Sequence, residues 1–324
     1  MFWSWYRASS NPTSRVAHGR IAGSHGIGPA RIRASPGLVL YIGNVGDMNA
    51  ARQAIHQGFL PSHGASQAFV WKYSPVNWGR RPRHFHVEPE LNLIASGHAR
   101  FGIGETVVEV AQGDLLRFSP AQDHVLLEAS PDLYLFAIGV DPALSSEVLR
   151  AEADQVMLPL RLRLANGDFR ALVNRASAIV DKDGVEQPCA ELWEQVHWLA
   201  SRPQTRPATV MHVLTRRTLS AVSQAPDLGL DMLANRMQTA SSEISRYFHR
   251  DVGMTFVRFR TRQRLLRLIA LMDGGQMTLG AAADAAGFGS YSQCHRTFQT
   301  ELGCSPRRFF HTGLRQQMQQ AYDP

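Results

Sequence analysis

Two arginines, Arg246 and Arg296, lie at equivalent positions in two copies of one sequence pattern. A guanidinium group holds several N–H donors in one plane and can therefore bind O6 and N7 of a guanine together. The copies align over Ser242, Ile244, Ser245, Arg246, Phe248 and Gly253 in the first, and Ser292, Cys294, His295, Arg296, Phe298 and Gly303 in the second. Each arginine is predicted to read a DNA base, with roughly 1 to 3 kcal/mol of discrimination. Arg246 could instead only clamp a phosphate.

Small polar side chains beside the two arginines complete the predicted contact set for double-stranded DNA. They are Ser241, Ser242, Ser245, Ser290, Tyr291, Gln293 and His295. Ser241 and Ser290 lie near predicted helix starts, where unpaired backbone N–H groups can bind phosphate.

The spacing of apolar residues predicts that these side chains lie on helices. Ile244 and Phe248 are four residues apart, as are Cys294 and Phe298, so each pair falls on one buried helix face. The arginines then point away from the core. Each predicted helix follows a shorter apolar helix and a turn of small residues, and serines suitable for an N-cap stand at its start. This order predicts two helix-turn-helix units.

A single long helix is predicted between the two units, over residues 256 to 272. Apolar residues there alternate with Arg258, Arg260, Arg262, Arg264 and Arg267. The arginines could keep a solvated amphipathic helix soluble. Between two DNA-reading units, we favour a position near phosphates.

The second copy carries the more specific motif. It comprises Gly287-Phe288, Ser290, Arg296, Phe298, Gly303 and Ser305-Pro306. With the first copy, it resembles the DNA-binding domain of the AraC family of bacterial transcription regulators over residues 208 to 311. The resemblance implies two helix-turn-helix units joined by one long helix, whose recognition helices enter successive major-groove segments on one face of the DNA.

Short alternating apolar runs fill residues 69 to 140 and predict strands. Runs such as AFVWKY, LNLIASG and LYLFAIGV are separated by Gly, Pro and Asp. Many short strands at close spacing indicate a small barrel or sandwich.

One string within these strands, His84-Phe85-His86 followed by Glu90 and Gly97, resembles the first motif of the cupin barrels. Residues 113 to 124 resemble a degenerate second motif. In metal-dependent cupins the matching residues are ligands, which would be His84, His86, Glu90 and His124 here. Strand alternation would place His84 and His86 on one face, as a shared metal requires.

Two interpretations of this set remain open. The residues could bind a divalent metal, or they could border a metal-free pocket for a small-molecule effector, as in the sensor barrels of AraC-type regulators. We predict no cofactor and no catalytic residues. The alternative is a metal-dependent cupin enzyme fused to a DNA-binding module.

Helical periodicity returns over residues 143 to 201. One apolar stripe includes Phe169, Leu172, Ala176 and Ile179, and another includes Trp193 and Val196. By resemblance these helices would carry a homodimer contact; the alternative is that they pack on the barrel.

Charge and composition support two domains in a chain of 324 residues with net charge +7. Residues 206 to 315 contain 15 arginines and 7 acids, whereas residues 37 to 205 have a net charge of −5. Positive potential therefore gathers where DNA contact is predicted. No apolar run approaches the roughly 20 residues of a membrane span, and three unpaired cysteines fit a reducing cytoplasm.

The predicted fold class is α+β multidomain. Its parts are a disordered basic tail (1–36), a cupin-like β-barrel with accessory helices (37–200), a linker (201–209), an all-α double helix-turn-helix domain (210–313) and a tail (314–324). The predicted function is sequence-specific transcription regulation in response to a small-molecule effector, with RNA polymerase as a further partner.

Overall fold

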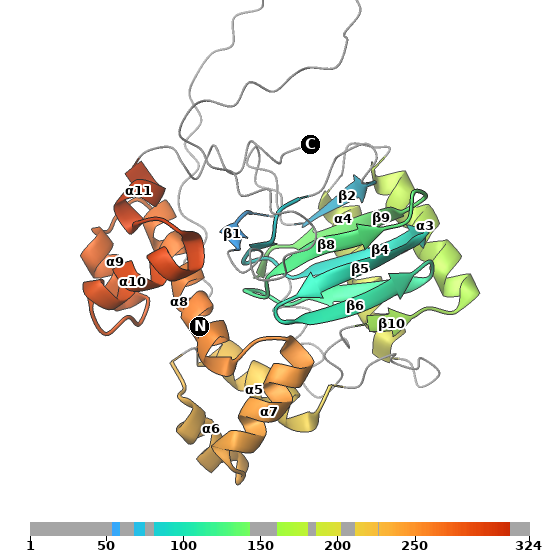
Figure 1. The fold of residues 1–324 in the computed structure, drawn as a ribbon. Helices are drawn as coiled ribbons and strands as arrows, with labels where there is room; N and C mark the ends of the chain where they lie inside the picture. Colours follow the sequence, from blue (N-terminus) through green and yellow to red (C-terminus); the bar gives the residue numbers. More distant parts are fainter. Residues whose placement is uncertain are drawn as a thin grey trace, which may run out of the picture.

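The computed structural model describes residues 54–58, 68–74, 81–142, 161–180, 186–201, 211–225 and 227–311. Figure 1 shows a strand domain, covered by two helices, beside an elongated helical domain. The predicted tails, and the predicted linker apart from Ser201, lie outside the described residues.

The strand domain contains two five-stranded sheets. The first has the order β1-β3-β8-β5-β6, formed by β1 (Ile55–His56), β3 (His84–Phe85), β8 (His124–Ala129), β5 (His98–Ile103) and β6 (Thr106–Ala111). The second has the order β10-β7-β4-β9-β2, formed by β10 (Arg161–Arg163), β7 (Asp114–Phe118), β4 (Glu90–Ser96), β9 (Tyr134–Val140) and β2 (Ala68–Tyr73).

Strand alternation places an apolar core between the sheets. Ile94 and Phe118 of the second sheet pack there with Phe101 and Leu126 of the first. The predicted short strands and cupin-like architecture are confirmed, but the closed barrel is not, because the described strands pair within two separate sheets. Closure would require strand pairing between the sheets, which local alternation does not specify.

Helices α3 (Asn166–Val180) and α4 (Glu186–Ser201) cover the outer face of the second sheet. Their stripe residues Leu172, Ala176 and Val196 are fully buried against strand residues such as Phe136. The periodic stripes therefore serve packing on the sheet, which was the alternative to a dimer contact.

The helical domain follows the predicted double pattern. It consists of α5 (Val213–Gln224), α6 (Leu230–Met237), α7 (Ser241–Val252), α8 (Phe256–Asp273), α9 (Leu279–Ala285), α10 (Tyr291–Leu302) and α11 (Pro306–His311). The apolar pairs of the two copies, Ile244–Phe248 and Cys294–Phe298, are fully buried. None of the described helices combines the length and hydropathy needed to cross a membrane.

The arginines of α8 contact other protein residues, and only the burial of Arg262 contradicts the prediction of a position near phosphates. Arg262 is 0 % exposed. Arg258 contacts Glu301, and Arg264 and Arg267 lie 3.8 and 4.0 Å from Asp227. The alternation of apolar residues and arginines in the α8 sequence does not show which carboxylates elsewhere in the chain contact those arginines.

The two domains meet along an interdomain seam, formed by Gly104, Glu105 and residues 120–123 of the strand domain and by Val252, Gly253, Arg262 and Gln263 of the helical domain. The Glu105 amide donates to the Gly253 carbonyl at 2.6 Å. Arg262 forms an ion pair with Asp123 across the same seam.

Candidate functional site

The nine predicted DNA-contacting residues lie on α7, on α10 or at the start of α10, and none is buried. Arg246 and Arg296 are exposed, as are Ser242, Ser290, Tyr291 and Gln293, whereas Ser241, Ser245 and His295 are partly exposed. Both arginines occupy the helix face opposite the buried pairs. Arg246 lies 3.7 Å from Glu243 and 4.6 Å from the Tyr247 ring, so intramolecular contacts orient its guanidinium.

The serines at the helix starts play different roles in the two copies. Ser290 is the N-cap of α10, and its hydroxyl accepts from the Gln293 amide at 3.2 Å. The Gln293 side chain accepts in turn from the Gly289 amide. In α7 the N-cap is Ala240, so the predicted serine cap is wrong there, and Ser241 instead donates to Asp231 of α6 at 2.8 Å.

Replacing Ser290 by alanine is expected to lower the free energy of unfolding by about 1 kcal/mol, because the Gln293 amide loses its acceptor. Thermal unfolding of the full chain measures the change. Ser292→Ala is the matched control, since Ser292 is exposed on the same helix and is not the cap residue. An equal shift in both variants would contradict the capping role.

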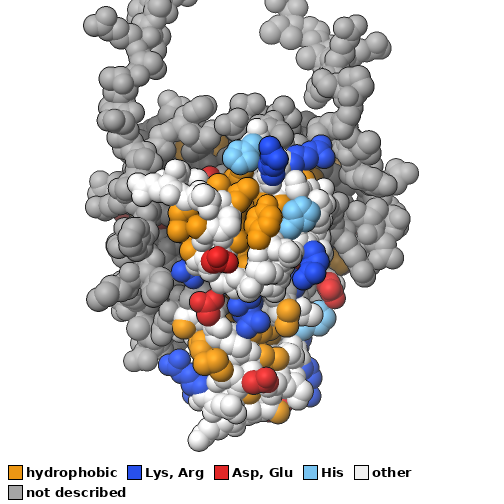
Figure 2. Space-filling view, turned by 90° about the vertical axis from the view of Figure 1, so that its left-hand side faces the viewer, with side chains coloured by type: hydrophobic (Ala, Val, Ile, Leu, Met, Phe, Trp, Pro, Cys, Tyr) orange, Lys and Arg blue, Asp and Glu red, His pale blue; other side chains and the backbone are white. Residues whose placement is uncertain are grey.

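Basic side chains extend along the helical domain. Figure 2 shows this domain from its outer side, with arginine side chains spread over the described surface among acidic and hydrophobic ones. Such a surface attracts phosphate and promotes association with DNA.

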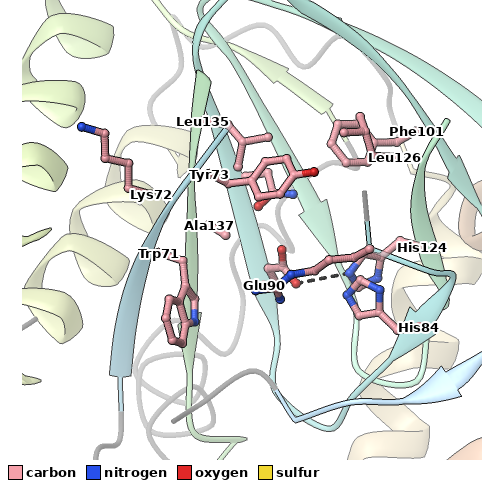
Figure 3. A pocket seen from close by; sticks show the side chains of 12 residues that line it. Trp71, Lys72, Tyr73, His84, Glu90, Phe101, His124, Leu126, Leu135 and Ala137 are labelled. Carbon is pink, nitrogen blue, oxygen red and sulfur yellow. Dashed lines mark ion pairs between the residues drawn. The ribbon is translucent and has the colours of Figure 1, made fainter. Parts of the chain in front are cut away.

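A cavity lies in the strand domain between the two sheets. The volume open to the centre of a water-sized sphere is about 70 Å³. A single water needs about 10 to 15 Å³ of such volume, so the cavity has room for several water-sized groups. Aromatic residues Trp71, Tyr73 and Phe101 line it beside His84, Glu90, Asn92 and His124. Figure 3 shows Lys72 pointing out of the cavity, while Glu90, His84 and His124 gather at one end.

The structure brings the four residues of the predicted cupin set together. One nitrogen or oxygen atom from each of His84, His86, Glu90 and His124 lies within 4.8 Å of the others, and all four are buried. Glu90 Oε2 is 2.9 Å from His86 Nε2 and 3.3 Å from His124 Nε2. β3, β4 and β8 each supply a residue, and His86 directly follows β3.

Burial and mutual contact set the ionisation of this cluster. Burial, with His124 and His86 nearby, holds the pKa of His84 well below its usual value. Burial opposes ionisation of Glu90, but His124 and His86 lower the pKa of its carboxyl overall. The same Glu90, against the effect of burial, raises the pKa of His86. The cluster therefore contains a neutral imidazole and a carboxylate at neutral pH.

These donors fit a divalent cation. Three imidazoles and one carboxylate suit zinc, cobalt or iron, and ligands must be deprotonated to bind. The separations are short enough for one ion to contact all four residues. Any ion bound there would supply a Lewis-acidic centre for an effector with oxygen or nitrogen donors.

Asn92 is a cavity residue that the sequence analysis missed. It is 4 % exposed, and its Oδ1 accepts no hydrogen bond from the part of the chain that the structure describes. Asn92 is two residues from Glu90 on β4, so both side chains face the cavity. This period-two relation inside ELNLIAS was the available signal. An occupant of the cavity with an N–H or O–H group could satisfy Asn92.

Comparison with protein-family models gives two matches. A model described as a helix-turn-helix domain matches residues 233–312. A model described as an AraC-like ligand binding domain matches residues 73–197. The first covers α7 and α10, and the second covers the cavity residues from Tyr73 onward. Comparison with curated proteins gave no match.

Several solved structures are similar to this chain. ToxT from Vibrio cholerae O395 is 12% identical with a TM-score of 0.41, over 75% of this chain and 96% of that one. The C-terminal domain of AraT, a response regulator from Geobacillus stearothermophilus, is 19% identical with a TM-score of 0.30, over 32% and 88% of the two chains. The AraC-like transcriptional activator CuxR is 13% identical with a TM-score of 0.27, over 64% and 74%.

Proposed function

Because this chain belongs to the AraC family of DNA-binding transcription regulators, we propose that it reads an operator through α7 and α10 and responds to a small molecule in the cavity between its sheets. The observation that carries the DNA proposal is the equivalence of two helices, each burying its apolar pair and exposing an arginine two residues after the first residue of that pair. Arg246 and Arg296 would bind guanines in two major-groove segments.

The remaining predicted residues support the arginines. Ser242, Ser245, Tyr291 and His295 share the outward helix faces and would bond to base edges or phosphates. Ser241, Ser290 and Gln293 would act mainly by fixing the helix starts, where backbone amides meet phosphate.

Site selection with the full chain tests the DNA proposal. Random duplexes retained at about 150 mM salt, close to physiological ionic strength, should contain two short conserved blocks about one helical turn apart. We expect Arg246→Ala to lose guanine preference in one block and Arg296→Ala in the other. Affinity for the selected site should fall roughly 5- to 150-fold for each, corresponding to 1 to 3 kcal/mol.

Arg236→Ala is the control, because Arg236 is an exposed arginine on α6, outside the two reading helices. It should lower affinity for selected and random DNA by similar factors and leave both blocks intact. If Arg296→Ala also left both blocks intact, α10 would have no role in base recognition.

For the effector, we propose a small molecule that places an aromatic or apolar part against Trp71, Tyr73 or Phe101 and a hydrogen-bond donor toward Asn92. A divalent cation held by His84, His86, Glu90 and His124 is a second candidate occupant. Both matching family models describe regulator domains, and such regulators are not normally enzymes. A metal-dependent enzyme is therefore the less favoured alternative.

Self-association and a promoter partner belong to the same proposal. Trp198 on α4 is 57 % exposed, although neighbouring residues of its helix pack on the sheet. We propose that this face carries a homodimer contact. At a promoter the regulator would also touch RNA polymerase, and its DNA target would place it in the cytoplasm.

A further inference from the structure

One wall of the cavity is also one side of the interdomain seam. On β3, His84 lines the cavity, whereas the next residue, Phe85, lies in the core of the helical domain, with the Arg262 guanidinium 4.6 Å from its ring centroid. At the start of β8, His124 lines the cavity, whereas the preceding residue, Asp123, pairs with Arg262. Adjacent residues in an extended chain face opposite sides, so β3 and the entry to β8 each place one residue in the cavity wall and one in the seam.

Arg262 connects this wall to the second reading unit. Its guanidinium reaches Asp123 and the Ala121 carbonyl in the strand domain and, at 2.7 Å, Glu301 in α10. Because the side chain is fully buried, displacing Asp123 would remove one of the two carboxylates that neutralise the Arg262 charge, and burial penalises an incompletely neutralised charge strongly. The position of Asp123 is therefore energetically tied to that of α8.

Neighbouring residues extend the connection to the end of α7. Gln122 Nε2 donates to the Val252 carbonyl at 2.6 Å within a buried environment. The Gln263 side chain donates to the Pro120 carbonyl at 3.4 Å. Residues 120–123 thus contact both α8 and the end of α7, immediately before the cavity residue His124.

β3 and β8 are joined by a short pairing. β3 has two residues, and its register with β8 consists of the pair His84 and His124. An occupant that bridges these imidazoles would strengthen the connection between the strands.

We propose that β3 and β8 couple the cavity to the seam, so that an occupant bridging His84 and His124 holds Phe85 and Asp123 against Arg262 and tightens the contact between the domains. This coupling rests on the proposed occupancy of the cavity. It is the route by which an occupant would affect the DNA-binding domain. The protein would exist in a state with the seam closed and a state with the seam open. An occupant that binds the closed state more tightly would raise the population of that state.

Amide hydrogen exchange of the full chain, with and without Co²⁺, tests the coupling. Visible absorption of Co²⁺ reports binding at the cluster, and exchange of the Glu105 amide, which donates across the seam to Gly253, reports seam opening. We expect bound Co²⁺ to slow that exchange about tenfold, within the usual range of coupling between sites. Binding of Co²⁺ without a change at Glu105 would overturn the proposal.

If Co²⁺ does not bind, a metal is excluded as the occupant but the coupling is still open to test. Two substitutions in the cavity then test whether the cavity wall is coupled to the seam. His124→Asn alters the shared wall, whereas Asn92→Ala alters β4 in the other sheet. The coupling requires His124→Asn to accelerate exchange at Glu105 at least several-fold more than Asn92→Ala does. Equal effects of the two substitutions would refute it.

Coupling is reciprocal, which gives a test from the other side. At Gly104, which has a φ of +54°, an added Cβ would lie 2.0 Å from the Gly253 carbonyl oxygen. Asparagine tolerates positive φ but brings that Cβ, so Gly104→Asn should open the seam and weaken Co²⁺ binding about tenfold. Gly113→Asn is the control, since Gly113 also has positive φ and its Cβ would meet only the end of Arg163 at 3.3 Å. If both variants bound Co²⁺ alike, cavity and seam would be independent.

Discussion

Replacing Arg262 by leucine is expected to separate the thermal unfolding of the two domains. The substitution leaves the buried Asp123 and Glu301 carboxylates without the cation between them. Breaking a buried ion pair costs about 3 to 5 kcal/mol. Arg83 and Arg258 still contact the two carboxylates, so the domains can relieve the cost by parting at the seam. Calorimetry should then show two transitions that are less coupled than in the unaltered chain.

Arg260→Leu is the control for this experiment. Arg260 lies on the same helix, but its contacts, the Leu228 carbonyl and the Phe256 ring, are within the helical domain. It should shift the transition of that domain without separating it from the other. Identical calorimetric profiles for the two variants would show that Arg262 does not connect the domains.

A second large effect is expected when pH falls, from His197 on α4. Burial, with Arg117 nearby, lowers the pKa of His197 to about 4. The folded chain therefore holds it neutral between pH 6.5 and 4, whereas the unfolded chain binds a proton there, so stability falls as pH falls through this window. His197 alone is expected to contribute a loss of about 2 kcal/mol between pH 7.5 and 5.

Denaturant unfolding at the two pH values measures this loss. His197→Gln removes the titrating group and should make stability about 2 kcal/mol less dependent on pH than in the unaltered chain. His98→Gln, at an exposed histidine of the same domain, should keep the full dependence. If His197→Gln kept it as well, another group would be responsible.

The helical domain was predictable because its signals are local. Pairs such as Ile244 and Phe248 mark a buried helix face within one turn, and the pattern occurs twice. The role of Arg262 was not predictable, because Asp123 lies 139 residues away in the sequence. Nothing in the periodicity of α8 separates a buried arginine from one that faces phosphate.

The strand domain shows the same division between local and distant information. Alternation predicted the strands, and the spacing of His84, His86 and Glu90 predicted a shared site, which the structure assembles with His124. The two-sheet arrangement depends on pairing between strands far apart in the chain, and the sequence signal for that pairing is weak. Asn92 was overlooked inside an apolar run, although its spacing from Glu90 places it on the same strand face.

The glycine contact at the seam limits how this regulator can be recombined with its relatives. A Cβ at Gly104 would lie 2.0 Å from the Gly253 carbonyl oxygen, and a Cβ at Gly253 would lie 2.4 Å from the Ile103 carbonyl oxygen. The domains therefore meet backbone to backbone. A chimera that joins this strand domain to a foreign reading domain would need a residue without a side chain at the end of the helix equivalent to α7. Exchange of whole domains would otherwise yield hybrids that retain both binding activities but lose communication between them.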